Sequence, residues 1–180
     1  FFMRVAILMD GGFTRVMGRA AGYQYNPDFI VALADCAVET PEVLHRVLYY
    51  DCAPYNGTLP LPVSGVEKEF NASGQWLDEL ARRNLFAVRR GVLKFRGFVP
   101  KKIPVSPRAL SDGDFKPSFE QKGVDMRIGL DMAVLAANRS VDRIILISND
   151  TDCVPAMKHV RKAGSSLCLV SSRTRLRLTN

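Results

Sequence analysis

The chain has 180 residues, 47% of them apolar and 24% charged, which suits one soluble domain with a large core and argues against a disordered chain. No apolar stretch approaches the roughly 18 uncharged residues that indicate a membrane span, so no membrane partner is expected. The formal net charge of +7 favours a polyanionic partner such as RNA or DNA, although a basic balance also serves solubility.

The cysteines and histidines give no zinc-like or disulfide pattern. The four cysteines lack the CxxC spacing, and the start "FFMRVAILMD" resembles a strand more than a signal peptide. We therefore expect reduced thiols in a cytoplasmic protein. His45 and His159 are isolated and are expected to be structural or exposed. Cys153 lies beside an acidic motif but has no histidine near it in sequence, so a thiol nucleophile is disfavoured.

The first half of the chain alternates apolar runs with helix signals. A near-continuous apolar run at the start is typical of a strand covered on both faces. Asn26 can cap a helix whose first position suits Pro27, and a later stretch holds three prolines and two glycines. We expect strands over 4–9 and 46–51, helices over 26–38 and 66–84, and a loop over 52–65.

The second half repeats this alternation. An alternating stretch predicts a strand that leads into a hairpin, a polar stretch with three prolines predicts a long loop, and Gly164 is placed to cap a helix. We expect a hairpin strand over 85–100, a loop over 101–121 that acts as a lid or is disordered, helices over 122–138 and 151–164, and strands over 143–148 and 165–172.

This order of elements predicts a single α/β domain over 1–180, with a mostly parallel central sheet and helices on both faces. Ligands of such sheets bind at the carboxyl ends of the strands. Asp10 and Asp51 end the first two predicted strands, and Asp150 and Asp152 follow the strand "RIILIS". We therefore expect these carboxylates to lie along one rim of the sheet.

Clustered carboxylates repel one another, and a hard divalent cation such as Mg²⁺ removes that repulsion. On the predicted helix from 122, Lys122 and Asp125 are three residues apart and share a face. On an ideal helix, Asp131 lies about 120° around the helix axis and about 9 Å along it from Asp125. Asp131 is therefore expected to bond a backbone donor or to orient the loop after the first strand. The alternatives are that Asp125 only suits a helix N-terminus and that Asp152 is a helix cap.

Three motifs, "VAILMDGGF", "KGVDMRIGLDMAVLA" and "ILISNDTDCVPAMKHVRKAG", occur in this order and resemble the NYN domain. More narrowly, they resemble its LabA-like branch within the PIN-like nuclease superfamily. The resemblance covers essentially the whole chain and implies a PIN-like Rossmannoid fold with an inserted hairpin. It also implies an endoribonuclease that depends on Mg²⁺ or Mn²⁺.

The resemblance further implies roles for residues at the matching positions. Many NYN domains carry Asn three residues after the first Asp, where this chain has Phe13, so the contribution of that polar group is in doubt. The implied metal ligands are Asp10, Asp125, Asp150 and Asp152, and Lys122 and Asp131 match recurrent positions of the family. In a metal-assisted hydrolysis, we expect Lys122 to stabilise charge on the phosphate, and Asp131, Ser148 and Asn149 to support the ligands.

A basic stretch over 89–102 is a candidate RNA path, because its cations can contact phosphates and Phe95 and Phe98 can stack on unpaired bases. The alternative is a solvated hairpin whose aromatic side packs on the protein. The tail "RTRLRL" can guide substrate, form an edge strand or make a dimer contact, which leaves a homodimer open. The residues predicted to bind RNA are Arg89, Arg90, Lys94, Arg96 and Arg173.

Two other functions compete with a nuclease. The stretch "ILMDGG" after a strand is similar to the nucleophile motif of haloacid dehalogenase-type phosphatases, but their second Asp is replaced here by Gly12. The other alternative is a non-catalytic module that keeps the fold and binds RNA or a protein partner. Metal-dependent cleavage of single-stranded RNA, compared with hydrolysis of a small phosphomonoester, separates the three.

Overall fold

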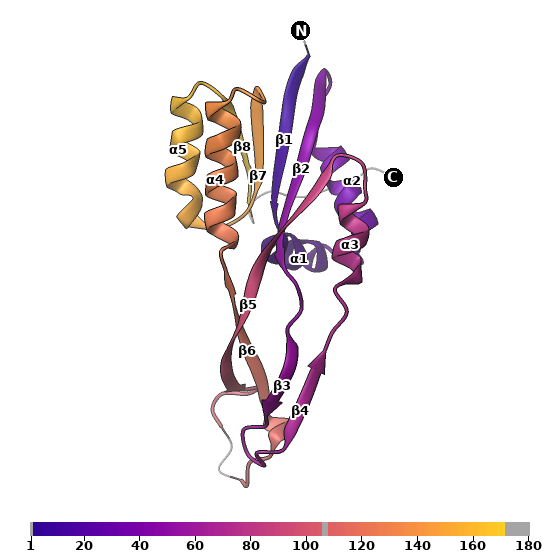
Figure 1. Ribbon diagram of the computed structural model, residues 1–180, viewed down its shortest axis with the longest axis vertical. Helices are drawn as coiled ribbons and strands as arrows, with labels where there is room; N and C mark the ends of the chain where they lie inside the picture. The colour runs from indigo at the N-terminus through magenta and orange to yellow at the C-terminus, as the bar shows by residue number, and fades with distance from the viewer. Residues whose placement is uncertain (1, 106–107, 172–180) are drawn as a thin grey trace.

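The computed structural model describes residues 2–105 and 108–171. The chain forms a head, built on a six-stranded sheet, and an arm that projects from one end of it (Figure 1). No helix in these described ranges could cross a membrane. In chain order the elements are β1 (Met3–Asp10), α1 (Gly11–Ala20), α2 (Pro27–Ala37), β2 (Glu42–Cys52), β3 (Asn56–Pro60), β4 (Glu67–Asn71), α3 (Gln75–Ala81), β5 (Phe86–Pro100), η1 (Asp112–Asp114), β6 (Phe115–Lys122), α4 (Val124–Ala137), β7 (Arg143–Ile147), η2 (Thr151–Cys153), α5 (Val154–Lys162) and β8 (Ser166–Val170).

The central sheet is mostly parallel, as the sequence predicts. Its strand order is β6-β5-β2-β1-β7-β8, and only the β5–β6 pair is antiparallel. In register, Asp10 lies opposite Tyr50 of β2, and Met9 lies opposite Ile147 of β7. The carboxyl ends of the three central strands therefore meet at one edge of the head, and this edge faces the arm (Figure 1).

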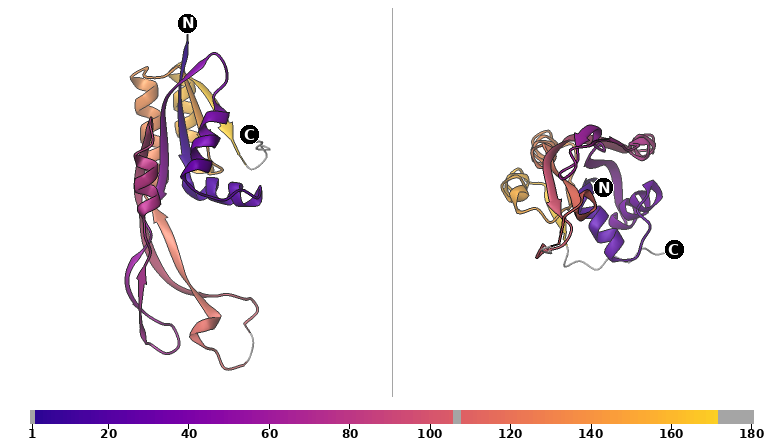
Figure 2. Two further views of the ribbon diagram at one scale, coloured as in Figure 1. Left: turned by 90° about the vertical axis from the view of Figure 1, so that its right-hand side faces the viewer. Right: turned by 90° about the horizontal axis from the view of Figure 1, so that it is seen from below.

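Alternating side chains of β1 divide the core into two layers. Ile7 and Met9 pack with residues of α2 and α3, whereas Leu8 packs with residues of α4 and α5. All three are fully buried, each worth about 1.5–3 kcal/mol of transfer free energy. Figure 2 shows the helices distributed over both faces of the sheet. A strand buried on both faces needs the continuous apolar run that the sequence shows.

Helix boundaries follow the caps that the sequence predicts at two places. The Asn26 side chain accepts a hydrogen bond of 2.8 Å from the amide of Phe29, and Pro27 occupies the first turn of α2. Gly164 follows α5 with a φ of +91°, a left-handed conformation that favours glycine. These two helix ends are fixed by local chemistry and could be predicted from sequence.

The arm consists of the described residues of 55–71 and 93–120 (Figure 2, left). Here β3 and β4 form a separate antiparallel pair, and the far parts of β5 and β6 form the hairpin that the sequence predicts. The ring of Tyr55 contacts the rings of Phe70, Phe95 and Phe119 at centroid distances of 5.2–6.4 Å. These rings, which come from both strand pairs, form the small core of the arm: Tyr55, Phe70, Phe95, Phe98 and Phe119.

Three predictions within or next to the arm are wrong. The expected loop over 52–65 contains β3, and the expected helix over 66–84 is β4 followed by the short α3. The expected loop over 101–121 ends in β6, which pairs with β5. The residues of these strands are exposed or half-buried, so the strands lack the apolar run of a central strand, and their partners lie in other parts of the chain.

Helix α1 was not predicted, and α4 begins later than predicted, at Val124. Helix α1 is rich in glycine, a poor helix former; it is held by its cap, Asp10, and by packing, because a Cβ on Gly18 would lie 2.8 Å from the ring of Phe29. Gly123 adopts a φ of +78° and makes a sharp turn between β6 and α4. Lys122 therefore belongs to β6 and does not share a helical face with Asp125.

Candidate metal and active site

Asp10 is the last residue of β1 and caps helix α1. Its Oδ1 accepts hydrogen bonds from the amides of Gly12, at 2.9 Å, and Phe13, at 3.3 Å. The Thr14 hydroxyl donates to the Asp10 carbonyl oxygen at 2.6 Å. One carboxylate oxygen is thus held by backbone donors, which fixes the direction of the other, Oδ2.

Ser148 joins Asp10 to Asp150. Ser148 is fully buried just beyond β7. Its hydroxyl donates a hydrogen bond to Asp10 Oδ2 at 3.4 Å and accepts one from the amide of Asp150 at 3.1 Å. Asp150 Oδ1 in turn accepts the amide of Asp152 at 2.8 Å and caps η2. The local cap is therefore Asp150, whereas Asp152 lies in the first turn. Asn149, between Ser148 and Asp150, is exposed.

Asp125 lies in the first turn of α4 and faces the same carboxylates. Burial raises its pKa first, and the neighbouring Asp150, Asp10 and Asp152 carboxylates raise it further. Burial also raises the pKa of Asp10, more than the hydrogen bonds from Phe13, Gly12 and Ser148 lower it. Carboxylates from β1, α4 and the segment after β7 therefore share one repulsive field.

These residues suit a hard divalent cation by their donor chemistry. The ligands on offer are carboxylate oxygens, which Mg²⁺ and Mn²⁺ prefer, and a cation would remove the repulsion that raises the pKa of Asp125. Within residues 2–105 and 108–171, no three His, Cys, Asp or Glu side chains already stand close enough to hold an ion together. The side chains would therefore have to draw together around the ion. His45 and His159 are exposed.

Cys153 is adjacent to this cluster but is poorly suited to be a nucleophile. The residue is buried, and burial together with the nearby Asp150, Asp125, Asp10 and Asp152 carboxylates raises the pKa of its thiol to about 11. A thiol with such a pKa is almost wholly protonated at neutral pH. The chemistry of the rim is therefore that of its oxygen ligands.

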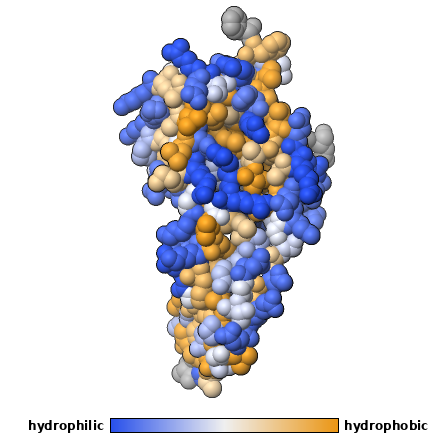
Figure 3. All heavy atoms as spheres, in the orientation of Figure 1, coloured by the Kyte–Doolittle hydropathy of each residue, from blue (hydrophilic) through white to orange (hydrophobic). Residues whose placement is uncertain are grey.

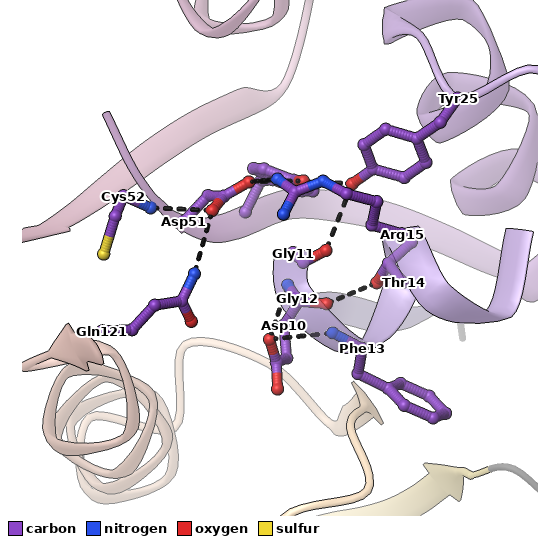
Figure 4. A network of polar contacts seen from close by, with 11 residues as sticks. Asp10, Gly11, Gly12, Phe13, Thr14, Arg15, Tyr25, Asp51, Cys52 and Gln121 are labelled. Atoms are coloured by element: carbon purple, nitrogen blue, oxygen red, sulfur yellow. Dashed lines mark hydrogen bonds and ion pairs between the residues drawn. The ribbon is translucent and has the colours of Figure 1, made fainter. Parts of the chain in front are cut away.

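A second acidic centre, which was not predicted to have a role, lies one strand away. Asp51, at the end of β2, is 1% exposed. It forms an ion pair with Arg15 of α1 and accepts hydrogen bonds from Tyr49 Oη at 3.2 Å and Gln121 Nε2 at 3.2 Å (Figure 4). The Cys52 amide, at 2.8 Å, completes its set of donors.

Gly11 lets this network approach Asp10. A Cβ at Gly11 would lie 2.5 Å from Tyr49 Oη and 2.8 Å from Asp51 Oδ2, so a side chain there would force the network apart. The proximity of Asp51 also raises the pKa of Asp10. Because α1 was not predicted, no sequence pattern placed Arg15 beside Asp51. The position of Asp51 at a strand end was the available signal.

A family model for the NYN domain matches residues 4–179. The chain belongs to the NYN domain family. It is therefore a member of the PIN-like nuclease superfamily, and its sheet and flanking helices agree with that fold. No match to a curated protein or to a solved structure was found. The narrower LabA-like assignment stays a prediction.

Two residues of this NYN domain lie differently from the prediction. Lys122, at the end of β6, forms an ion pair with Glu120. Asp131 was expected to bond a backbone donor or to orient the loop after β1; among the described residues, its Oδ2 accepts hydrogen bonds from Tyr50 Oη at 2.8 Å and Arg89 Nε at 2.9 Å. Asp131 thus ties α4 to β2 and β5, which the helical spacing alone could not reveal.

The residues predicted to bind RNA are partly engaged within the NYN domain. Arg89 pairs with Asp131, Arg90 with Asp78, and Arg96 with Glu120. Lys94, on the arm part of β5, is exposed, and Arg173 lies outside the described residues. Phe95 and Phe98 pack in the arm core, which supports the alternative of a hairpin whose rings face the protein.

Phe13, the departure from the family pattern, is partly buried and packs against the core on the α2 side of the sheet. Figure 4 shows its ring directed away from the Asp10 carboxylate while its amide points toward it. The rim thus keeps a backbone donor at this position but no polar side chain.

A haloacid dehalogenase-type phosphatase requires a carboxylate as general acid two residues after its nucleophile. Gly12 occupies that position here and has no side chain to serve.

Proposed function

We propose that this NYN domain is a ribonuclease that hydrolyses RNA phosphodiester bonds internally with Mg²⁺ or Mn²⁺. The observation that carries the proposal is the Ser148 hydroxyl, which joins Asp10 to Asp150 across the ends of β1 and β7. Asp125 reaches the same cluster from α4. Together with membership of a nuclease superfamily, this supports a hydrolytic site at the rim.

The four rim carboxylates would have different roles toward the cation. Asp10 and Asp150 would hold the cation directly, and Asp125 and Asp152 would bind it through oxygen or water, or would orient the attacking water. When bound, the cation would lower the pKa of a water molecule and neutralise charge on the phosphate. The buried Ser148 would fix the separation of Asp10 and Asp150, because it bonds one side chain and the backbone of the other.

The substrate would approach the rim from the side of the arm. Figure 3 shows hydrophilic side chains gathered where the head meets the arm. Lys94 is exposed on a strand that leads there, and a net charge of +7 favours a polyanion. Lys122 is also exposed but already pairs with Glu120. Arg89 is a weaker candidate for RNA contact, since its guanidinium already forms two hydrogen bonds with Asp131. A homodimer and a cytoplasmic location are separate proposals.

Cleavage of an end-labelled single-stranded RNA tests the proposal. We expect cleavage with Mg²⁺ or Mn²⁺, none with EDTA, and no hydrolysis of p-nitrophenyl phosphate. Asp150→Asn should lower the rate by at least 100-fold while RNA affinity stays within about threefold. The control is Asp35→Asn, an exposed position on α2, which should cleave like the parent.

Two results would contradict the proposal. Full activity of Asp150→Asn would remove the rim from the reaction, and unchanged cleavage in EDTA would remove the cation. RNA binding without cleavage in any divalent metal would favour the non-catalytic binding module instead.

A further inference from the structure

A cavity of about 520 Å³ lies beside the rim and has no role in the metal chemistry described above. It is bounded by α1, the segment before α2, the end of β2, the start of α3, and β5 with β6. Its volume falls in the range of small-ligand sites in proteins. Its lining includes Arg15, Tyr25, Asp51, Trp76, Leu93 and Gln121.

The cavity and the metal site share a wall. Gln121 lines the cavity, and its Oε1 lies 3.5 Å from where a Cβ on Gly12 would be. The amide of Gly12 is hydrogen-bonded to Asp10, at 2.9 Å. One glycine turn therefore separates the cavity from the carboxylate that would hold the cation. A group in this cavity would be attached to a phosphate at the rim through a short linkage, as a base is attached through its ribose.

The lining combines aromatic and polar groups. Trp76 and Tyr25 meet edge to face, with ring centroids 5.8 Å apart and an interplanar angle of 72°. Leu93 adds apolar surface, and the Gln121 amide supplies both a donor and an acceptor. Rings and amides of this kind recognise unpaired bases, by stacking and by hydrogen bonds to the base edges.

The charged residues of the lining are one ion pair and one further cation. Arg15 is ion-paired with Asp51, so this pair has no net charge. Arg19 also lines the cavity and is exposed, so the three charged residues sum to +1. The rings and the amide suit a planar base, and the remaining positive charge suits the phosphate that a nucleotide carries with it.

We propose that this cavity binds the unpaired base of the nucleotide that flanks the scissile phosphate. The inference rests on the proposed function and adds a base-binding subsite to it. A base paired within a helix could not enter, because its edge and both faces are already occupied. The site would therefore select for unstacked nucleotides by shape, whatever the sequence elsewhere.

The chain carries a direct reporter of this cavity, because Trp76 is its single tryptophan. In the Asp150→Asn protein, a short single-stranded RNA should change Trp76 fluorescence in a saturable way. An oligonucleotide of the same length built of abasic nucleotides should bind, by anisotropy of a label, without that change. Gln121→Ala should weaken the fluorescence titration about fivefold, as expected for one hydrogen bond. Gln24→Ala, an exposed glutamine outside the lining, should match the parent.

RNA that binds without changing Trp76 emission, or an abasic chain that changes it equally, would overturn the proposal. A nucleoside 5′-monophosphate and ribose 5-phosphate separate this inference from the nuclease assignment, because neither needs to be cut. If the protein cuts RNA but neither probe changes its fluorescence, the nuclease assignment stands and the base cavity is refuted. If the protein cuts no RNA but the nucleotide alone changes its fluorescence, the nuclease assignment is refuted and the base cavity stands.

Discussion

Replacing Asp125 by Asn should stabilise the protein without metal and destabilise it, relative to the parent, with metal. Partial burial raises the pKa of this carboxylate most, and the neighbouring Asp150, Asp10 and Asp152 carboxylates raise it further. Asparagine keeps the size of the side chain and removes one charge from that field. Because Asp125 is exposed to solvent, screening limits the gain to about 0.5–1 kcal/mol.

This gain corresponds to a rise in Tm of roughly 1–4 °C for a domain of this size. The pKa of Asp125 in the folded protein is raised above its ordinary value of 3.8. A carboxyl of this kind contributes stability that is present below pH 3.8 and is lost as pH rises through the folded-state pKa. The advantage of Asp125→Asn in EDTA should therefore grow as the pH is raised from 4 to 7.

Added cation should reverse the order. At a Mn²⁺ concentration of 100 times its dissociation constant, the parent gains about 2.7 kcal/mol, and a variant that binds weakly gains much less. Differential scanning fluorimetry in EDTA and in Mn²⁺ measures both values. Asp35→Asn on α2 is the matched control, and its shift should be the same in both buffers. A variant that is less stable than the parent in EDTA, or that gains as much from Mn²⁺, would refute the reasoning.

Three further results are expected. Ser148→Ala should weaken Mn²⁺ binding about 10-fold by calorimetry, because the two rim carboxylates lose their link, and an unchanged affinity would show that the link is unimportant. Arg15→Met should lower the free energy of unfolding, measured in urea, by about 3 kcal/mol, because the buried Asp51 loses its ion pair. The control Arg19→Met, at an exposed position, should change it by less than about 0.5 kcal/mol. Equal losses in the two variants would count against the ion pair. The Cys153 thiol should react slowly with iodoacetamide at pH 7.5, since its pKa is raised to about 11, and fast labelling in the folded protein would contradict that environment.

The head of the molecule could be predicted from sequence because its signals are local. The apolar runs of β1 and β7 are long enough to indicate buried parallel strands, and the topology rule then places Asp10 and Asp150 at one edge. Asn26 and Gly164 indicate helix ends, Asn26 by its capping side chain and Gly164 by its left-handed backbone conformation. In each case, the residue that carries the signal also makes the structure.

The arm and the second acidic centre could not be predicted in the same way. The strand residues around Phe70 owe their conformation to rings from other strands, and α1 owes its stability to a cap and to packing under Phe29. Arg15 meets Asp51 only after that helix has formed. Lys122 was misplaced because the turn at Gly123 ends the strand before the helix begins, and the partners of Asp131 come from β2 and β5. Such contacts are set by tertiary structure, which one sequence does not show.

The most direct test of the acidic rim is a crystal of the parent protein soaked in Mn²⁺, measured for anomalous scattering at the manganese edge. We predict a peak in contact with the carboxylates of Asp10 and Asp150 and within reach of Asp125. The same soak of Asp150→Asn crystals should show a much weaker peak. A parent crystal with no peak at the rim, or with manganese bound only elsewhere, would contradict the metal site and with it the proposed nuclease.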